Sequence, residues 1–228
     1  MKPTFKNISG IILLTALAFF CWLMLKIVLV YAPMKLDAGF LLLKQDYIHI
    51  DLWRVAFFTH VFTSMLVLIA GFSQFSTTLL QKKPTLHRTL GYIYVINILF
   101  ITGPAGLIMS FYANGGMIAR IAFISLSVLW IFFTAIALYK AIQKDFIAHK
   151  KFMIRSYALT LSAISLRSWK VLLAHFTDMR PMDRYRVIAW LGWGLNLLIA
   201  EFIILQQIKK RQAIALANKK ISSKIEEI

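Results

Sequence analysis

Two histidines, each at the start of an apolar stretch and each followed by cations, are the residues best suited to carry chemistry in this chain. His87 is followed by Arg88, and His149 is followed by Lys150 and Lys151. Imidazoles from two different helices can supply both axial ligands of a haem iron, and cations beside them can meet the haem propionates. The alternative is that each histidine is an ordinary interfacial residue that hydrogen-bonds a helix start.

The residues that follow His87 favour the cofactor interpretation. On a helix the face of His87 continues through Gly91 and Tyr94, and a glycine lets a flat group approach the backbone. The pattern predicts one bis-histidine haem b near a membrane face, with electron transfer as its role and a quinone or another redox molecule as partner. The predicted cofactor site comprises His87, His149, Arg88, Arg155, Gly91 and Tyr94.

A second layer of polar residues lies inside the apolar segments and gives an alternative function. An arginine within a membrane span costs at least about 2.5–3.5 kcal/mol, so Arg167 should face protein and have a partner. No carboxylate shares its expected depth, which leaves an anionic or carbonyl ligand, a haem propionate, helix carbonyls, or a side chain that snorkels outward past Trp169. The alternative is a cofactor-free binding or transport protein for a small anion or a lipid headgroup, and a third interpretation is an accessory subunit of a larger membrane complex. The second-layer site comprises His60, Gln74, Thr160 and Arg167.

One helix face connects the two layers. His149 and Arg167 are about five helical turns apart, or about 27 Å. Met153, Ser156 and Thr160 fall between them at spacings of three or four residues. The spacing predicts a small, polar face on one continuous helix, turned towards protein or a cofactor.

The composition places these residues in a membrane protein. The chain has 228 residues, of which 60% are hydrophobic, and its mean hydropathy is +0.72. The formal net charge is +17, but the cations lie in short connections and at the ends of apolar runs, which indicates lipid contact and not nucleic acid. The single cysteine, Cys21, excludes an intramolecular disulfide and a cysteine metal cluster. No nucleotide-binding or hydrolase motif is present, so the motifs indicate no enzyme class.

Six apolar segments are long enough to cross a hydrocarbon core of about 30 Å. We predict an all-α membrane protein with a single transmembrane domain over residues 1–228, a four-helix core from helices 2–5, and a cytoplasmic tail at 209–228 that lies on the headgroups. The more positive side holds both termini, so the N- and C-termini and the two histidines are expected at the cytoplasmic face. Pro104 predicts a kink in the third segment. The predicted spans are about 10–31, 53–76, 90–112, 118–140, 153–175 and 187–208.

Three stretches carry a resemblance to a known family. They are GFSQF at Gly71–Phe75, HRTLGYIY from His87, and HKKFMIRSYALT from His149. With His60 and Arg167 they resemble the bacterial membrane family catalogued as domain of unknown function 2306, over roughly residues 55–170. The resemblance implies a multi-pass protein of the bacterial inner (cytoplasmic) membrane whose activity is not established. Its characteristic positions would be His60, Gln74, His87, Arg88, Gly91, Tyr94, His149, Met153, Arg155, Thr160 and Arg167.

A looser likeness is to di-haem b-type membrane cytochromes, which hold haems between histidines of alternate helices. His87 and His149 look like one such pair. The predicted span at 118–140 has no histidine. The second pair is therefore missing, so the likeness implies one haem and not a two-haem path across the membrane.

Overall fold

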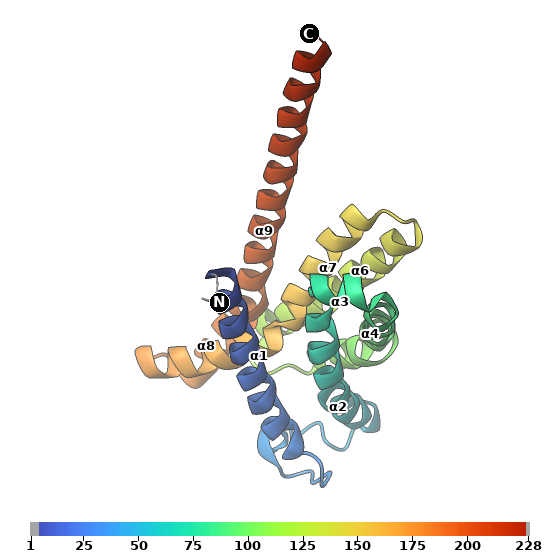
Figure 1. Cartoon of the computed structure of the whole chain (residues 1–228). Helices are drawn as coiled ribbons and strands as arrows, with labels where there is room; N and C mark the ends of the chain where they lie inside the picture. Colours follow the sequence, from blue (N-terminus) through green and yellow to red (C-terminus); the bar gives the residue numbers. More distant parts are fainter. Residues whose placement is uncertain (1–4, 227–228) are drawn as a thin grey trace.

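The computed structural model describes the backbone of residues 5–226 and the side chains of residues 15, 16 and 18–218. Every regular element in this part of the chain is helical (Figure 1). Within it, four helical segments are long and apolar enough to cross a membrane: Asp51–Ser73, Pro84–Phe111, Gly116–Ile142 and Pro181–Asn218. The all-helical, multi-pass membrane architecture is therefore confirmed.

The first of these segments is α2 (Asp51–Ser73), and the third is α6 (Gly116–Ile142). α1 (Phe5–Leu29) precedes them and contains a shorter apolar helix, Ala18–Leu29. α3 (Thr77–Lys82) is a single short helix in the connection that follows α2, where Ser76 caps it by accepting a hydrogen bond from Leu79 N. These bounds agree with the predicted spans at 53–76 and 118–140 to within a few residues.

The second spanning segment contains the predicted kink. α4 (Pro84–Ile96) is followed by a π-helical turn, η2 (Asn97–Thr102), and then by α5 (Gly103–Phe111). Pro104 has no backbone N–H and its ring crowds the preceding turn, which disfavours a regular α-helix there. The Gly103 N–H instead donates to the carbonyl of Ile98, five residues back. A Cβ at Gly103 would lie 2.2 Å from that carbonyl oxygen, so the turn requires glycine.

The predicted span at 153–175 is divided into two helices. α7 (Phe146–Thr160) ends before Leu161, and α8 (Ser162–Phe176) begins after it. At the junction Leu161 has a ψ of −11°, and the hydroxyl of Ser165, one turn further on, donates to Asn196 Oδ1 of α9 at 2.9 Å. α8 then packs mainly against α9 and projects from the side of the bundle (Figure 1). The single polar face expected from His149 to Arg167 is therefore broken.

The last helix, α9 (Pro181–Glu226), has 46 residues, which corresponds to roughly 69 Å at 1.5 Å per residue. This is more than twice the thickness of a hydrocarbon core of about 30 Å. Residues 209–226, which belong to the expected cytoplasmic tail, form a helical extension of α9 that continues away from the bundle (Figure 1).

The main core lies where α2, α4, α6 and α7 meet, as expected for helices 2–5, and α9 adds Trp193 to it. The helices approach closely at Gly71 of α2, which lies against the rings of Tyr94 and Tyr157. A second cluster closes the other end of α2, where Tyr31, Leu41, Trp53 and Phe57 pack under the loop that contains η1 (Gly39–Leu43). The first cluster holds together the helices that carry both predicted histidines.

Candidate functional site

His149 lies in the first turn of α7 with one ring nitrogen already engaged. Asp145 caps this helix by accepting a hydrogen bond from Ala148 N at 3.0 Å. The His149 Nδ1 is 2.8 Å from the carbonyl oxygen of Ala137 on α6. Because a carbonyl only accepts, Nδ1 is the donor, and the lone pair of the neutral ring is on Nε2. Histidines that bind metals are commonly fixed by such a bond from the other nitrogen.

His87 lies in the first turn of α4, which begins at Pro84. Its ring is partly buried. Its Nδ1 is buried and has no hydrogen-bond partner among the described residues. His149 lies close enough to His87 to influence it electrostatically, so the two residues are near each other although they lie on α4 and α7. The structure thus brings together the two predicted imidazoles, each with an unsatisfied nitrogen.

Gln74, predicted in the second layer with His60, lies instead beside His87. Its amide nitrogen donates to the His87 carbonyl at 3.3 Å and to Ser73 Oγ at 3.1 Å. Its Oε1 covers the open face of Gly91, where a Cβ would be 3.0 Å away. We expected a flat group to lie against Gly91, but the flexible end of the Gln74 side chain occupies that space.

The predicted propionate partners differ in availability. Arg155 makes a two-point ion pair with Glu201 of α9, with Nε–Oε1 and NH2–Oε2 separations of 2.5 and 2.8 Å. Arg88 is exposed, and in the described part of the chain neither Arg88 nor Lys151 is paired with a carboxylate. Arg88 and Lys151 thus remain free for an anion, whereas Arg155 is engaged.

Tyr94 and Thr160 belong to a buried hydroxyl network between α4, α6 and α7. The Tyr94 hydroxyl lies 2.7 Å from Ser156 Oγ and 2.9 Å from Thr160 Oγ1. Thr134 Oγ1 lies 2.7 Å from Ser156 Oγ, and Trp130 Nε1 donates to Thr160 Oγ1 at 3.0 Å. The small, polar face of α7 is therefore satisfied by neighbouring helices.

His60 forms a separate layer with Arg167. His60 Nδ1 lies 3.0 Å from the Thr102 carbonyl oxygen, next to the π-turn. The charge of Arg167 acts on His60, so the two are neighbours although they lie on α2 and α8. Arg167 NH1 donates to the Ala163 carbonyl at 2.6 Å, and its side chain is exposed on the protein surface. The structure thus brings His60 near Arg167 but separates both from Gln74 and Thr160.

Lys44, which the sequence analysis did not single out, is buried at the end of the bundle opposite His87 and His149. It has 2% of its surface exposed. Its ammonium group donates to Asn114 Oδ1 at 2.6 Å and to the Tyr112 carbonyl. Burial, followed by the charge of Arg120, lowers the pKa of Lys44 to about 8. Nothing in the sequence around Lys44 distinguishes this buried lysine from the exposed cations in other loops.

The His87–His149 pair offers two imidazoles, which are the type of donor that a haem iron takes. His149 offers Nε2 from a ring held by a backbone carbonyl, and His87 has an unpartnered buried nitrogen. The porphyrin would need the space over Gly91, which the end of the Gln74 side chain fills. Three or more His, Cys, Asp or Glu side chains come together nowhere in the described part of the chain. The donor set is therefore two imidazoles, with the end of the Gln74 side chain beside them over Gly91.

Comparison with known families agrees with this architecture. The family model described as predicted membrane protein (DUF2306) matches residues 57–204. The model EXPERA (EXPanded EBP superfamily) matches residues 2–111. No curated protein and no solved structure matches the chain. The DUF2306 match covers more than half of the chain and includes both His87 and His149. The chain therefore belongs to the DUF2306 family of predicted membrane proteins.

Proposed function

We propose that this chain is an electron-transfer protein of the bacterial inner membrane that binds one haem b through His87 and His149. The observation that carries the proposal is the hydrogen bond of 2.8 Å between His149 Nδ1 and the Ala137 carbonyl. This bond fixes the ring and leaves Nε2 as the donor, as in many metal-binding histidines. In the proposed topology six segments cross the membrane, both termini are cytoplasmic, and the haem lies near the cytoplasmic face.

The residues around the two imidazoles have distinct roles in this proposal. His149 and His87 would hold the iron from two helices, and a bound haem would supply one-electron redox chemistry. Arg88 and Lys151 are the free cations that would neutralise the propionates. Gln74 would have to turn away from Gly91 to make room for the porphyrin, which would break two hydrogen bonds longer than 3 Å.

A haemin titration of the purified protein tests the two ligands. We expect the wild type to develop a six-coordinate b-type spectrum at one equivalent. His87→Ala and His149→Ala should each lose it, whereas His175→Ala, an exposed histidine on α8, should keep it. Equal binding by all four proteins would exclude these two residues as the iron ligands. Circular dichroism shows whether each variant keeps its helices.

Gln74→Ala provides a second test, in which the affinity for haemin is expected to increase. The substitution removes the amide that covers Gly91 and leaves a side chain too short to reach it. Haemin should therefore bind more tightly to this variant than to the wild type. Weaker binding would mean that Gln74 contacts the cofactor instead of competing with it.

A second candidate function rests on the exposed guanidinium of Arg167 beside His60. One of its nitrogens donates to Ala163, which leaves other donors for a small anion or a lipid headgroup. In this case a ligand would raise the melting temperature of the wild type. Arg167→Gln would remove that effect and His149→Ala would keep it. The haem proposal instead expects haemin binding to be lost in His149→Ala and kept in Arg167→Gln.

A further inference from the structure

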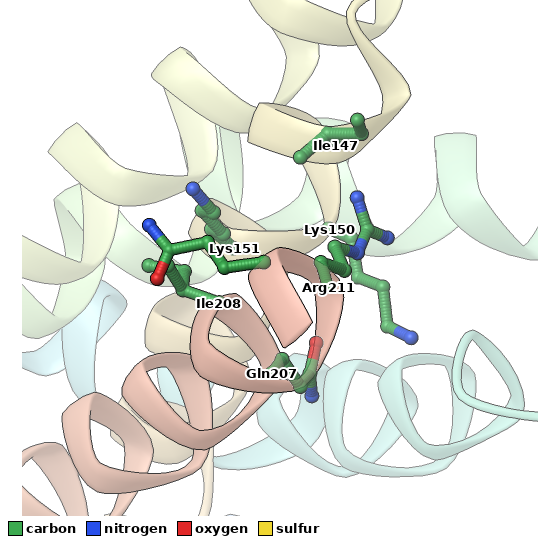
Figure 2. A pocket seen from close by; sticks show the side chains of 7 residues that line it. Ile147, Lys150, Lys151, Gln207, Ile208 and Arg211 are labelled. Atoms are coloured by element: carbon green, nitrogen blue, oxygen red, sulfur yellow. The ribbon is translucent and has the colours of Figure 1, made fainter. Parts of the chain in front are cut away.

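A basic hollow lies where the start of α7 meets α9, and of its lining residues only Lys151 is also assigned to the haem. Its volume is about 170 Å³. Figure 2 shows residues of α7 facing those of α9 across it, with Lys150 and Arg211 on one side and Lys151 on the other. The lining residues are Ile147, Lys150, Lys151, Gln207, Ile208, Arg211 and Gln212.

The charge of this hollow is unbalanced. Three of its seven lining residues are cations, two are amides, and none is a carboxylate. Within the described residues Lys150, Lys151 and Arg211 form no ion pair. The nearest acidic residue along the chain, Asp145, is held by Ala148 N and lies 3.8 Å from Lys140. The cations are therefore available to a group from outside the protein.

The apolar part of the lining indicates which anion fits. Ile147 and Ile208 line the hollow together with the cations, and 53% of the Ile147 surface is exposed. The hollow also lies where α9 leaves the bundle, since Arg155 and Glu201 pair one to three turns deeper between the same two helices. A small free anion has no apolar part that could contact the isoleucines. A lipid has a charged headgroup next to glycerol and acyl carbons, so it can contact both the cations and the isoleucines.

We infer that this hollow, lined by Lys150, Lys151 and Arg211, binds the phosphate headgroup of an anionic membrane lipid. The two cations of α7 and the arginine of α9 contact the phosphate, because arginine and lysine are the usual donors to it. Gln207 and Gln212 add amide donors, and the isoleucines contact the first acyl carbons. A lipid bound here connects α7 to α9, and Lys150 and Arg211 contact it without a role towards the haem.

The test compares three proteins in detergent micelles titrated with phosphatidylglycerol, with melting temperature as the readout. The site variant is Lys150→Gln/Lys151→Gln/Arg211→Gln. The matched control, Lys82→Gln/Lys83→Gln/Lys144→Asn, removes three exposed cations elsewhere. Asn is chosen at residue 144 because the backbone there has a φ of 61°.

We expect phosphatidylglycerol to stabilise the wild type and the control at the same concentration. The site variant should need at least about tenfold more lipid, since each cation near a membrane surface contributes appreciably to anionic-lipid binding. Lys150→Arg/Lys151→Arg should retain the response. If the site variant does not fold, Lys151→Gln is compared with Lys82→Gln in the same way.

Three results would overturn the inference. In the first, the site variant responds at the wild-type lipid concentration. In the second, the control loses as much response as the site variant, which would indicate general charge attraction. In the third, inorganic phosphate or phosphatidylcholine at the same concentration stabilises the wild type equally, which would exclude selection of an anionic lipid.

Discussion

Gly71→Ala tests the close helix packing that positions both histidine-bearing helices. A Cβ at residue 71 would lie 2.5 Å from the Tyr94 ring and 2.6 Å from the Tyr157 ring. Neither ring has room to retreat, because Tyr94 is fully buried with its hydroxyl bonded, and Tyr157 donates to the Leu68 carbonyl at 3.2 Å. The substitution must therefore separate α2 from α4 and α7.

The expected size follows from three contributions. Overpacking a tight core costs about 1–3 kcal/mol, and a lost buried hydroxyl bond at Tyr94 costs about 1 kcal/mol more. Replacing glycine by alanine within a helix returns about 1 kcal/mol. We expect the free energy of unfolding to fall by about 2 kcal/mol on balance.

Unfolding by sodium dodecyl sulfate, followed by circular dichroism, measures this change. Gly194→Ala on α9 is the matched control, because nothing lies within 4 Å of its Cβ position. It should raise stability by about 0.5–1 kcal/mol. If both substitutions change stability in the same direction, or if Gly71→Ala has no effect, the described helix contact is wrong.

Two further predictions concern charged residues. Glu201→Gln should lower the free energy of unfolding by about 1–3 kcal/mol, which lies between the values for exposed and buried ion pairs. The reason is that Arg155, a partly buried arginine, would lose its carboxylate partner. The same detergent titration measures the change, and an unchanged free energy of unfolding would refute the pairing. Lys44 has a pKa of about 8 when folded and an ordinary value of 10.5, so between these values the unfolded chain binds more protons and wild-type stability should rise with pH. Lys44→Met should flatten that rise in melting curves recorded from pH 7 to 11, and an equal rise in the variant would contradict the assignment.

The long apolar runs predicted the helices well because hydropathy and length alone define a segment that can cross a membrane. The kink near Pro104 was also predictable, since proline removes a backbone donor. The break at Leu161 was not, because the residues on either side of it, Ala158 and Ser165, bond to Asn196 of α9, and a single sequence does not show which helix becomes their neighbour. Hydropathy measures how apolar a segment is, and it does not show whether the segment forms one straight helix or bends into two.

The candidate site was predicted in part. His87 and His149 were expected to converge, and their helices do pack together around the main core. Gln74 was grouped with His60, although 14 residues of helix separate them by about 21 Å, which is enough to place Gln74 at the opposite end of α2. The Arg155 ion pair depends on which helices become neighbours, and a single sequence does not contain that information.

The visible absorption spectrum of the wild-type protein, purified from haem-replete cells and reduced with dithionite, tests the central claim most directly. The proposed His87–His149 site predicts the sharp Soret and α-bands of a six-coordinate b-type haem at about one haem per chain. A spectrum without these bands, or one that a His87→Ala/His149→Ala double variant reproduces in full, would contradict it.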